Sequence, residues 1–85
     1  MAADFTYTTE VLEELARHGL VPRSDTPPQQ LRDAVRELYK HEIKRLKARL
    51  LAREFPKGEY AEKVIELRRR YPLLSVPTEL WIDRR

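Results

Sequence analysis

Two histidines and two serines are the residues of this sequence whose types suit catalysis or metal binding. The chain has no cysteine, so a nucleophile would have to be a serine or threonine activated by a histidine. Ser24 and Ser75 each lie two residues from a proline in predicted loops. His18 stands at the predicted end of a helix, where the dipole favours a cation. His41 has Glu37 one turn before it but no H-E-x-x-H pattern around it. We therefore expect no enzymatic activity, no resident metal and no cofactor.

A dense group of basic side chains is the first candidate for a binding surface. Residues 36–53 carry seven basic and two acidic side chains, whereas residues 1–35 carry three basic and six acidic ones. Such side chains can cover the edges of a core with their aliphatic stems, meet an acidic protein, or follow a phosphate backbone. At helical spacing they fall on both flanks of an apolar stripe. This basic ridge consists of Arg36, Lys40, Lys44 and Lys47 on one flank and of Arg45, Arg49 and Arg53 on the other.

An apolar C-terminal tail, residues 73–85, is the second candidate. It is predicted either to close the core of its own chain or to fill a groove on a partner, where tryptophan and leucine are common anchors. Deleting the tail should be damaging under both readings. Its six large apolar residues are Leu73, Leu74, Val76, Leu80, Trp81 and Ile82.

The elements that position these residues are helices. A helix start signal is formed by Thr26 as N-cap, Pro27 at the first helical position and Gln29 three residues after the cap. After Pro28 no proline or glycine occurs before Pro56. This predicts a long helix over about 27–53, about 40 Å in length. A shorter helix is expected over about 59–71, and the short link between the two predicts an antiparallel helical hairpin.

The N-terminal part of the chain is predicted to hold a third, short helix over about 9–18. Thr8 is its expected N-cap, and Gly19 is placed to end it in a left-handed conformation, with Leu20 closing a Schellman motif on Leu15. Residues 1–7 show no period and are expected to form a mobile arm, although Phe5 and Tyr7 are large enough to pack. The fold class is all-α, in one small domain over 1–85.

Composition limits how this domain can gain stability. The chain has 85 residues, a net charge of +3 and no cysteine, so neither a large core nor a disulfide is available. A core of this size typically supplies only about 3–5 kcal/mol. Association into a helical bundle, such as a homodimer, is one remaining source, with α-helical packing within the chain as the other. No apolar run is long enough to cross a membrane and no secretory signal is recognisable, which makes the cytoplasm the expected compartment.

Binding is therefore the expected activity. The sequence favours a protein–protein interaction module, such as an adaptor, a regulatory subunit or an assembly factor, that meets an acidic partner through the long helix and the Trp81 segment. A small nucleic-acid-binding protein that uses the basic ridge is the alternative. A bundle that binds a metal between two chains is a third reading.

Overall fold

The computed structural model describes residues 4–83 and is built from three α-helices and three single 3-10 turns. Within this range there is no β-strand, only one isolated antiparallel bridge between Tyr7 and Ile82. The prediction of an all-α class is confirmed. The helices are α1 (Thr9–Arg17), α2 (Pro28–Leu51) and α3 (Tyr60–Arg69), and the 3-10 turns are η1 (Lys57–Glu59), η2 (Pro72–Ser75) and η3 (Thr78–Leu80).

Helix α1 begins and ends as its sequence predicts. The Val11 N–H donates to the Thr8 hydroxyl oxygen at 3.3 Å, which satisfies an amide of the first turn. At the other end Gly19 adopts a φ of 74°, and the Leu20 N–H donates to the Leu15 carbonyl at 2.9 Å. This is the Schellman arrangement, which glycine enters at little steric cost.

Helix α2 starts one residue later than expected, and Thr26 is not its N-cap. The Thr26 hydroxyl instead accepts a hydrogen bond from the Arg23 N–H at 2.9 Å and so closes the turn before the helix. Pro27 occupies the N-cap position without any side-chain cap, and Pro28 is the first helical residue. A proline at this position costs no hydrogen bond, because the amide N–H that it lacks would have no intrahelical partner.

The end of α2 repeats the Schellman motif with a different residue at its critical position. The Glu54 N–H donates to the Arg49 carbonyl and the Arg53 N–H to the Leu50 carbonyl, both at 3.0 Å. Arg53 has a φ of 58°, the only positive value of a non-glycine residue among the described residues. A side chain in this left-handed region costs about 1–2 kcal/mol, so this turn carries strain that the turn at Gly19 does not.

Substitutions at the left-handed positions of these two turns should change the free energy of unfolding in opposite directions. We expect Arg53→Gly to raise the free energy of unfolding by about 1 kcal/mol, because glycine relieves the left-handed strain. Gly19→Ala should lower it by a similar amount, although no atom lies within 4 Å of the added methyl group. Urea unfolding followed by circular dichroism measures both. A destabilised Arg53→Gly variant would show that the arginine side chain makes a contribution larger than its strain.

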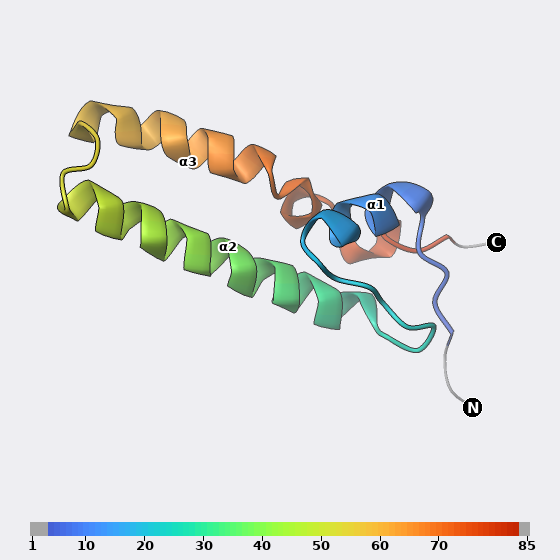
Figure 1. The fold of residues 1–85 in the computed structure, drawn as a ribbon. Helices are drawn as coiled ribbons and strands as arrows, with labels where there is room; N and C mark the ends of the chain where they lie inside the picture. The colour runs from blue at the N-terminus through green and yellow to red at the C-terminus, as the bar shows by residue number, and fades with distance from the viewer. Residues whose placement is uncertain (1–3, 84–85) are drawn as a thin grey trace.

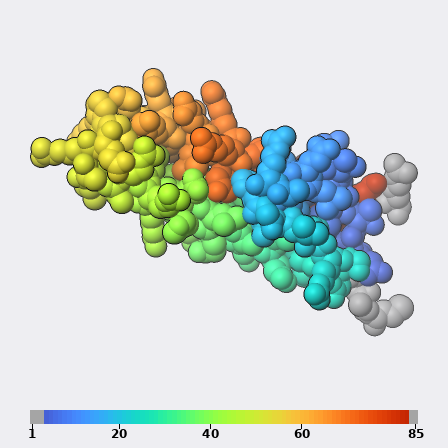
Figure 2. All heavy atoms as spheres, viewed as in Figure 1, coloured from blue at the N-terminus to red at the C-terminus, as the bar shows by residue number. Residues whose placement is uncertain are grey.

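The three helices and the tail form a rod in which the other elements pack along α2. Helix α3 lies beside the C-terminal half of α2 after the chain reverses direction, and α1 and the tail lie beside the N-terminal half (Figure 1). The rod measures 53 × 18 × 17 Å (Figure 2). Its radius of gyration is 15.7 Å, against about 12 Å for a compact domain of this length. The length of α2 that α3 leaves unmatched is therefore covered by the chain's own α1 and tail.

The buried side chains are concentrated at one end of the rod, which we call the head (residues 4–39 and 71–83). The other end, the hairpin end, comprises residues 40–70. Leu46 and Leu67 are its only buried described residues and keep 8% and 6% of their surface exposed, whereas Leu15, Val35 and Trp81 in the head have no exposed surface. The remaining buried residues of the head are Tyr7, Val11, Leu31, Tyr71 and Leu73.

The described part of the predicted arm, residues 4–7, packs against the tail and the loop before α2. The Phe5 N–H donates to the Ser24 carbonyl at 2.7 Å, and the Thr8 N–H to the Trp81 carbonyl at 3.1 Å. Tyr7 is buried and its hydroxyl donates to the Thr26 carbonyl. Residues 1–3 lie outside the described range. The two ends of the described chain are thus joined in the head.

Burial of two tyrosines predicts a loss of stability in alkali. Burial raises the pKa of Tyr7 above 10.0, and it raises the pKa of Tyr71 with help from Glu42 and against the opposing effect of Arg70. Both phenols hold their protons more tightly when folded, so their contribution is complete below pH 10 and is lost as pH rises through the folded values. Urea unfolding across this range should show the decline. Tyr7→Phe should make it shallower, and an unchanged slope would exclude Tyr7 as a cause.

Candidate functional site

The residues that could have supported catalysis are not assembled into a reactive group. The imidazole of His18 stacks on the ring of Tyr71, with the centroids 4.4 Å apart, and its Nε2 is buried without a hydrogen-bond partner. His41 is exposed on α2, and no hydrogen bond among the described residues joins a serine to a histidine. Within residues 4–83 no three His, Cys, Asp or Glu side chains are grouped to hold a metal ion. None of the helices described is long and apolar enough to span a membrane.

The tail lies against its own chain. Trp81 is fully buried and Leu73 is 4% exposed, so these two residues belong to the core of the head. Leu74, Val76 and Ile82 are half-buried against that core. Leu80 alone of the six predicted contact residues projects into solvent, with 64% of its surface exposed. The tail therefore has little apolar surface left for another protein.

Arg32 anchors the tail and was not recognised from the sequence. Its Nη1 donates to the Val76 carbonyl at 3.0 Å and its Nη2 to the Leu74 carbonyl at 3.1 Å. The Val76 carbonyl also accepts from the Trp81 Nε1 at 2.9 Å. The available signal was the position of Arg32, which falls on the apolar stripe of α2 between Leu31 and Val35. A charge at such a position requires buried or half-buried acceptors.

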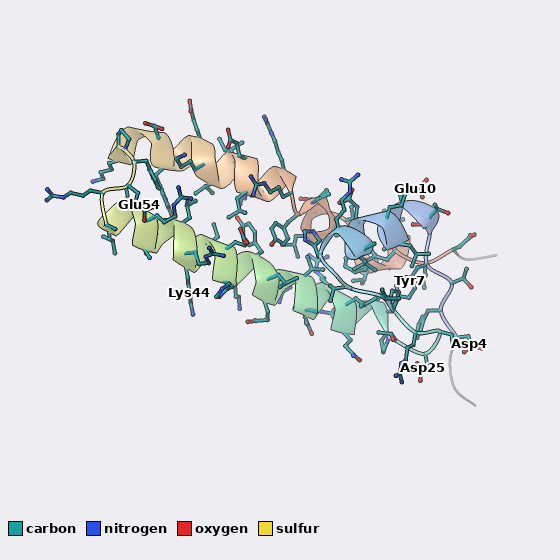
Figure 3. The ribbon with its side chains drawn as sticks, in the orientation of Figure 1. Asp4, Tyr7, Glu10, Asp25, Lys44 and Glu54 are labelled. Atoms are coloured by element: carbon teal, nitrogen blue, oxygen red, sulfur yellow. The ribbon has the colours of Figure 1, made fainter. Side chains whose placement is uncertain are left out.

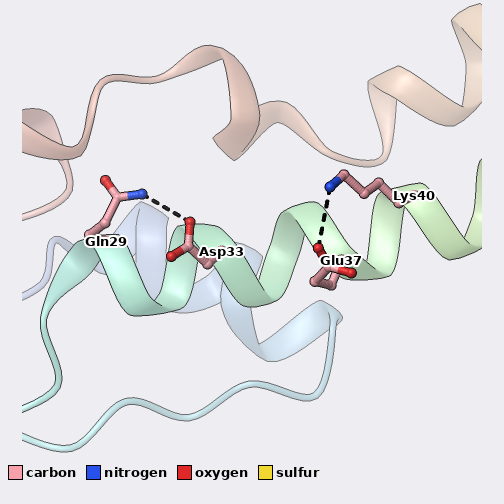
Figure 4. A network of polar contacts seen from close by, with 4 residues as sticks. All are labelled: Gln29, Asp33, Glu37 and Lys40. Carbon is pink, nitrogen blue, oxygen red and sulfur yellow. Dashed lines mark hydrogen bonds and ion pairs between the residues drawn. The ribbon is translucent and has the colours of Figure 1, made fainter.

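The structure divides the basic ridge into parts with different surroundings. Lys40 pairs with Glu37 at 3.4 Å along the solvent side of α2, next to a similar contact in which Gln29 Nε2 donates to Asp33 at 2.9 Å (Figure 4). Arg36, Lys44 and Lys47 are exposed on α2. Arg45 and Arg49 line a groove shared with α3, and Arg53 lies at the strained turn. The seven residues thus differ in their partners and surroundings.

A charged groove lies between α2 and α3 in the hairpin end. Its volume is about 230 Å³. Arg45, Lys63 and Arg70 have no ion-pair partner among the described residues, so their charge is available to a ligand. Two carboxylates in the same groove offset part of this charge. The lining residues of this basic groove are Glu42, Arg45, Leu46, Arg49, Lys63, Glu66, Leu67 and Arg70.

The tip of the hairpin end adds an apolar hollow to the groove. Leu50, Leu51, Phe55 and Pro56 line it together with Arg53, Glu54 and Lys57. Leu51 is 78% exposed, the highest value for a large apolar residue in the hairpin end. The ring of Phe55 lies under two cations, with Arg49 Cζ at 5.7 Å and Lys63 Nζ at 4.9 Å from its centroid. Apolar and basic surface are therefore adjacent at the tip.

Sequence reasoning missed the part of this site that comes from α3. Lys63 and Arg70 stand on a helix separated from the basic ridge by the chain reversal. Only the pairing of α2 with α3 places them beside Arg45 and Arg49. The i, i+3 and i+7 spacing of Lys63, Glu66 and Arg70 did indicate that they share one face of a helix.

The arrangement as a whole suits the binding of a ligand that offers both acidic and apolar groups. It provides unpaired guanidinium and ammonium groups, exposed aliphatic surface and no nucleophile–base pair. No protein-family model, no curated protein and no solved structure matches this chain.

Proposed function

We propose that this chain is a non-catalytic protein–protein interaction module, an adaptor, regulatory subunit or assembly factor, that binds an acidic partner through its hairpin end. The observation that carries the proposal is the exposed Leu51 beside the apolar hollow and the basic groove. This contact region differs from the one that the sequence favours, because Trp81 is buried in the core of the head and has no surface for a partner.

The chemistry of the hairpin end supports a protein partner. An apolar side chain inserted next to Leu51 and Phe55 would supply the buried centre of an interface. Arg45, Lys63 and Arg70 would then lie at its rim, where charge steers association and selects an acidic surface. We expect the partner in the cytoplasm, the compartment that the sequence favours.

Nucleic acid is the second candidate, favoured by the meeting of four basic side chains in one groove. Glu42 and Glu66 line the same groove and would repel a phosphate backbone at close range. A ridge making about six phosphate contacts would lose roughly a thousandfold in affinity between about 50 and 200 mM salt. An interface with an apolar centre should change much less. The mixed charge of the groove therefore favours the protein partner.

The experiment is an affinity pull-down of the tagged chain from its native lysate, divided into nuclease-treated and untreated halves. The binding variant is Leu51→Asp, and the matched control is Val21→Asp, which places the same charge at an equally exposed aliphatic residue of the head (87% exposed). We expect a discrete protein that survives nuclease, is lost with Leu51→Asp and is kept with Val21→Asp. Loss of all bound material after nuclease would make nucleic acid the target.

A further inference from the structure

The two ends of the rod carry opposite charge. Residues 40–70 of the hairpin end have eleven basic and five acidic side chains, whereas the described residues of the head have four basic and nine acidic ones. Arg84 and Arg85 lie outside the described residues and follow the head in sequence. Even when their two charges are added, the head has more acidic than basic side chains. Figure 3 shows Asp4, Glu10 and Asp25 on the head and Lys44 on the hairpin end. One molecule thus presents both an acidic and a basic surface, separated along the rod.

The acidic surface of the head includes the outer face of α1. Val11 and Leu15 point into the core, which leaves Glu10 and Glu13 exposed on the opposite side of this helix. Leu12 lies at the edge of this face, between Glu13 and the core residue Leu15, and is 41% exposed. Glu14 forms an ion pair with Arg17 at 3.1 Å, so it is already neutralised within α1. The outer face of α1 therefore carries unpaired carboxylates, with an exposed aliphatic side chain at its edge.

We propose that a second copy of this chain docks antiparallel to the first, so that the outer face of α1 in each copy meets the basic groove of the other. This inference rests on the proposed function, since it names the acidic partner of the same surface. Antiparallel pairing makes two identical contacts between opposite charges around one two-fold axis, as in most homodimers. Parallel pairing would place two basic hairpin ends together. The hairpin end has few buried residues of its own, so contact with a second copy would add buried surface there.

The absence of cysteine makes the geometry directly testable by disulfide trapping. One preparation carries Leu12→Cys on α1 and the other carries Glu66→Cys in the groove, and neither change removes a basic group of the groove or a carboxylate of α1. After mixing and mild oxidation we expect the disulfide between positions 12 and 66 to dominate over both symmetric products. Dominant pairing of position 66 with itself, or a statistical mixture of all three products, would overturn the proposal.

Charge reversal tests the same contact without oxidation. Arg45→Glu with Arg70→Glu should weaken self-association at least about tenfold in sedimentation equilibrium, because like charges would then face each other. Arg68→Glu with Arg69→Glu makes the same charge change on exposed residues outside the groove and should have a much smaller effect. Mixing the groove variant with Glu10→Lys, Glu13→Lys chains should restore association. Wild type should also dissociate as salt rises from about 50 to about 500 mM.

The outcomes separate this inference from the proposed function. If the pure chain remains monomeric at low salt while a foreign protein is captured through Leu51, the second-copy inference fails and the interaction module stands. If the 12–66 disulfide forms but the pull-down yields no foreign protein, the adaptor role fails and self-association stands. Equal effects of the groove variant and its control would remove the groove from the interface.

Discussion

Replacing Trp81 with alanine is expected to unfold most of the protein at 25 °C. The indole has no exposed surface and packs among α1, α2 and the tail, and its Nε1 donates to the Val76 carbonyl at 2.9 Å. Truncating a buried tryptophan typically costs about 3–5 kcal/mol. A domain of this size has only about 3–5 kcal/mol in total, so the single change is comparable to its entire stability.

Urea unfolding followed by the helical circular dichroism signal would measure the loss of stability. Two further substitutions identify which property of the indole causes it. Trp81→Phe keeps most of the apolar volume but not the donor, so we expect it to remain folded with a smaller loss. Leu80→Ala changes the adjacent residue, which is 64% exposed, and should alter stability by less than about 0.5 kcal/mol. A Trp81→Ala variant with wild-type helicity and urea midpoint would show that the head does not depend on the indole.

The helices were predictable because their signals are local. The expected ranges of about 9–18, 27–53 and 59–71 correspond to Thr9–Arg17, Pro28–Leu51 and Tyr60–Arg69. The Schellman end at Gly19 follows from one glycine and one leucine in fixed positions. The end of α2 at Leu51, two residues before the predicted one, was not predictable, because an arginine at position 53 gives no signal of a left-handed conformation.

The position of the tail was not predictable, because it depends on contacts between residues far apart in sequence. An apolar segment interrupted by prolines has no helical or strand period, and the same residues suit a core or an interface. What decides between them is Arg32, more than forty positions before the carbonyls that it binds. The basic groove has the same origin, since Arg45 and Arg70 meet only through the pairing of α2 with α3.

Replacing Arg32 with methionine should release the tail from α2 while leaving the helices formed. Methionine keeps an apolar stem of similar length, so the change removes mainly the two donors. The Leu74 carbonyl then loses its guanidinium partner, and the Val76 carbonyl keeps only the Trp81 Nε1. Hydrogen bonds to a charged group contribute about 1.5–3 kcal/mol each, so we expect a loss of about 2 kcal/mol or more. Arg32→Lys should recover only part of it, because one ammonium group cannot reproduce the planar fork of a guanidinium.

The tail carries its own reporter for this experiment, since Trp81 is the only tryptophan of the chain. Release of the tail should shift its fluorescence to longer wavelength at urea concentrations where the helical signal is still unchanged. Arg36→Met makes the same chemical change one turn further along α2 at an exposed residue, and it should leave both signals as in the wild type. If Arg32→Met instead lost fluorescence and helicity in one transition at the wild-type midpoint, the two hydrogen bonds would contribute nothing to holding the tail. The tail would then be held by apolar packing of Trp81 and Leu73 alone.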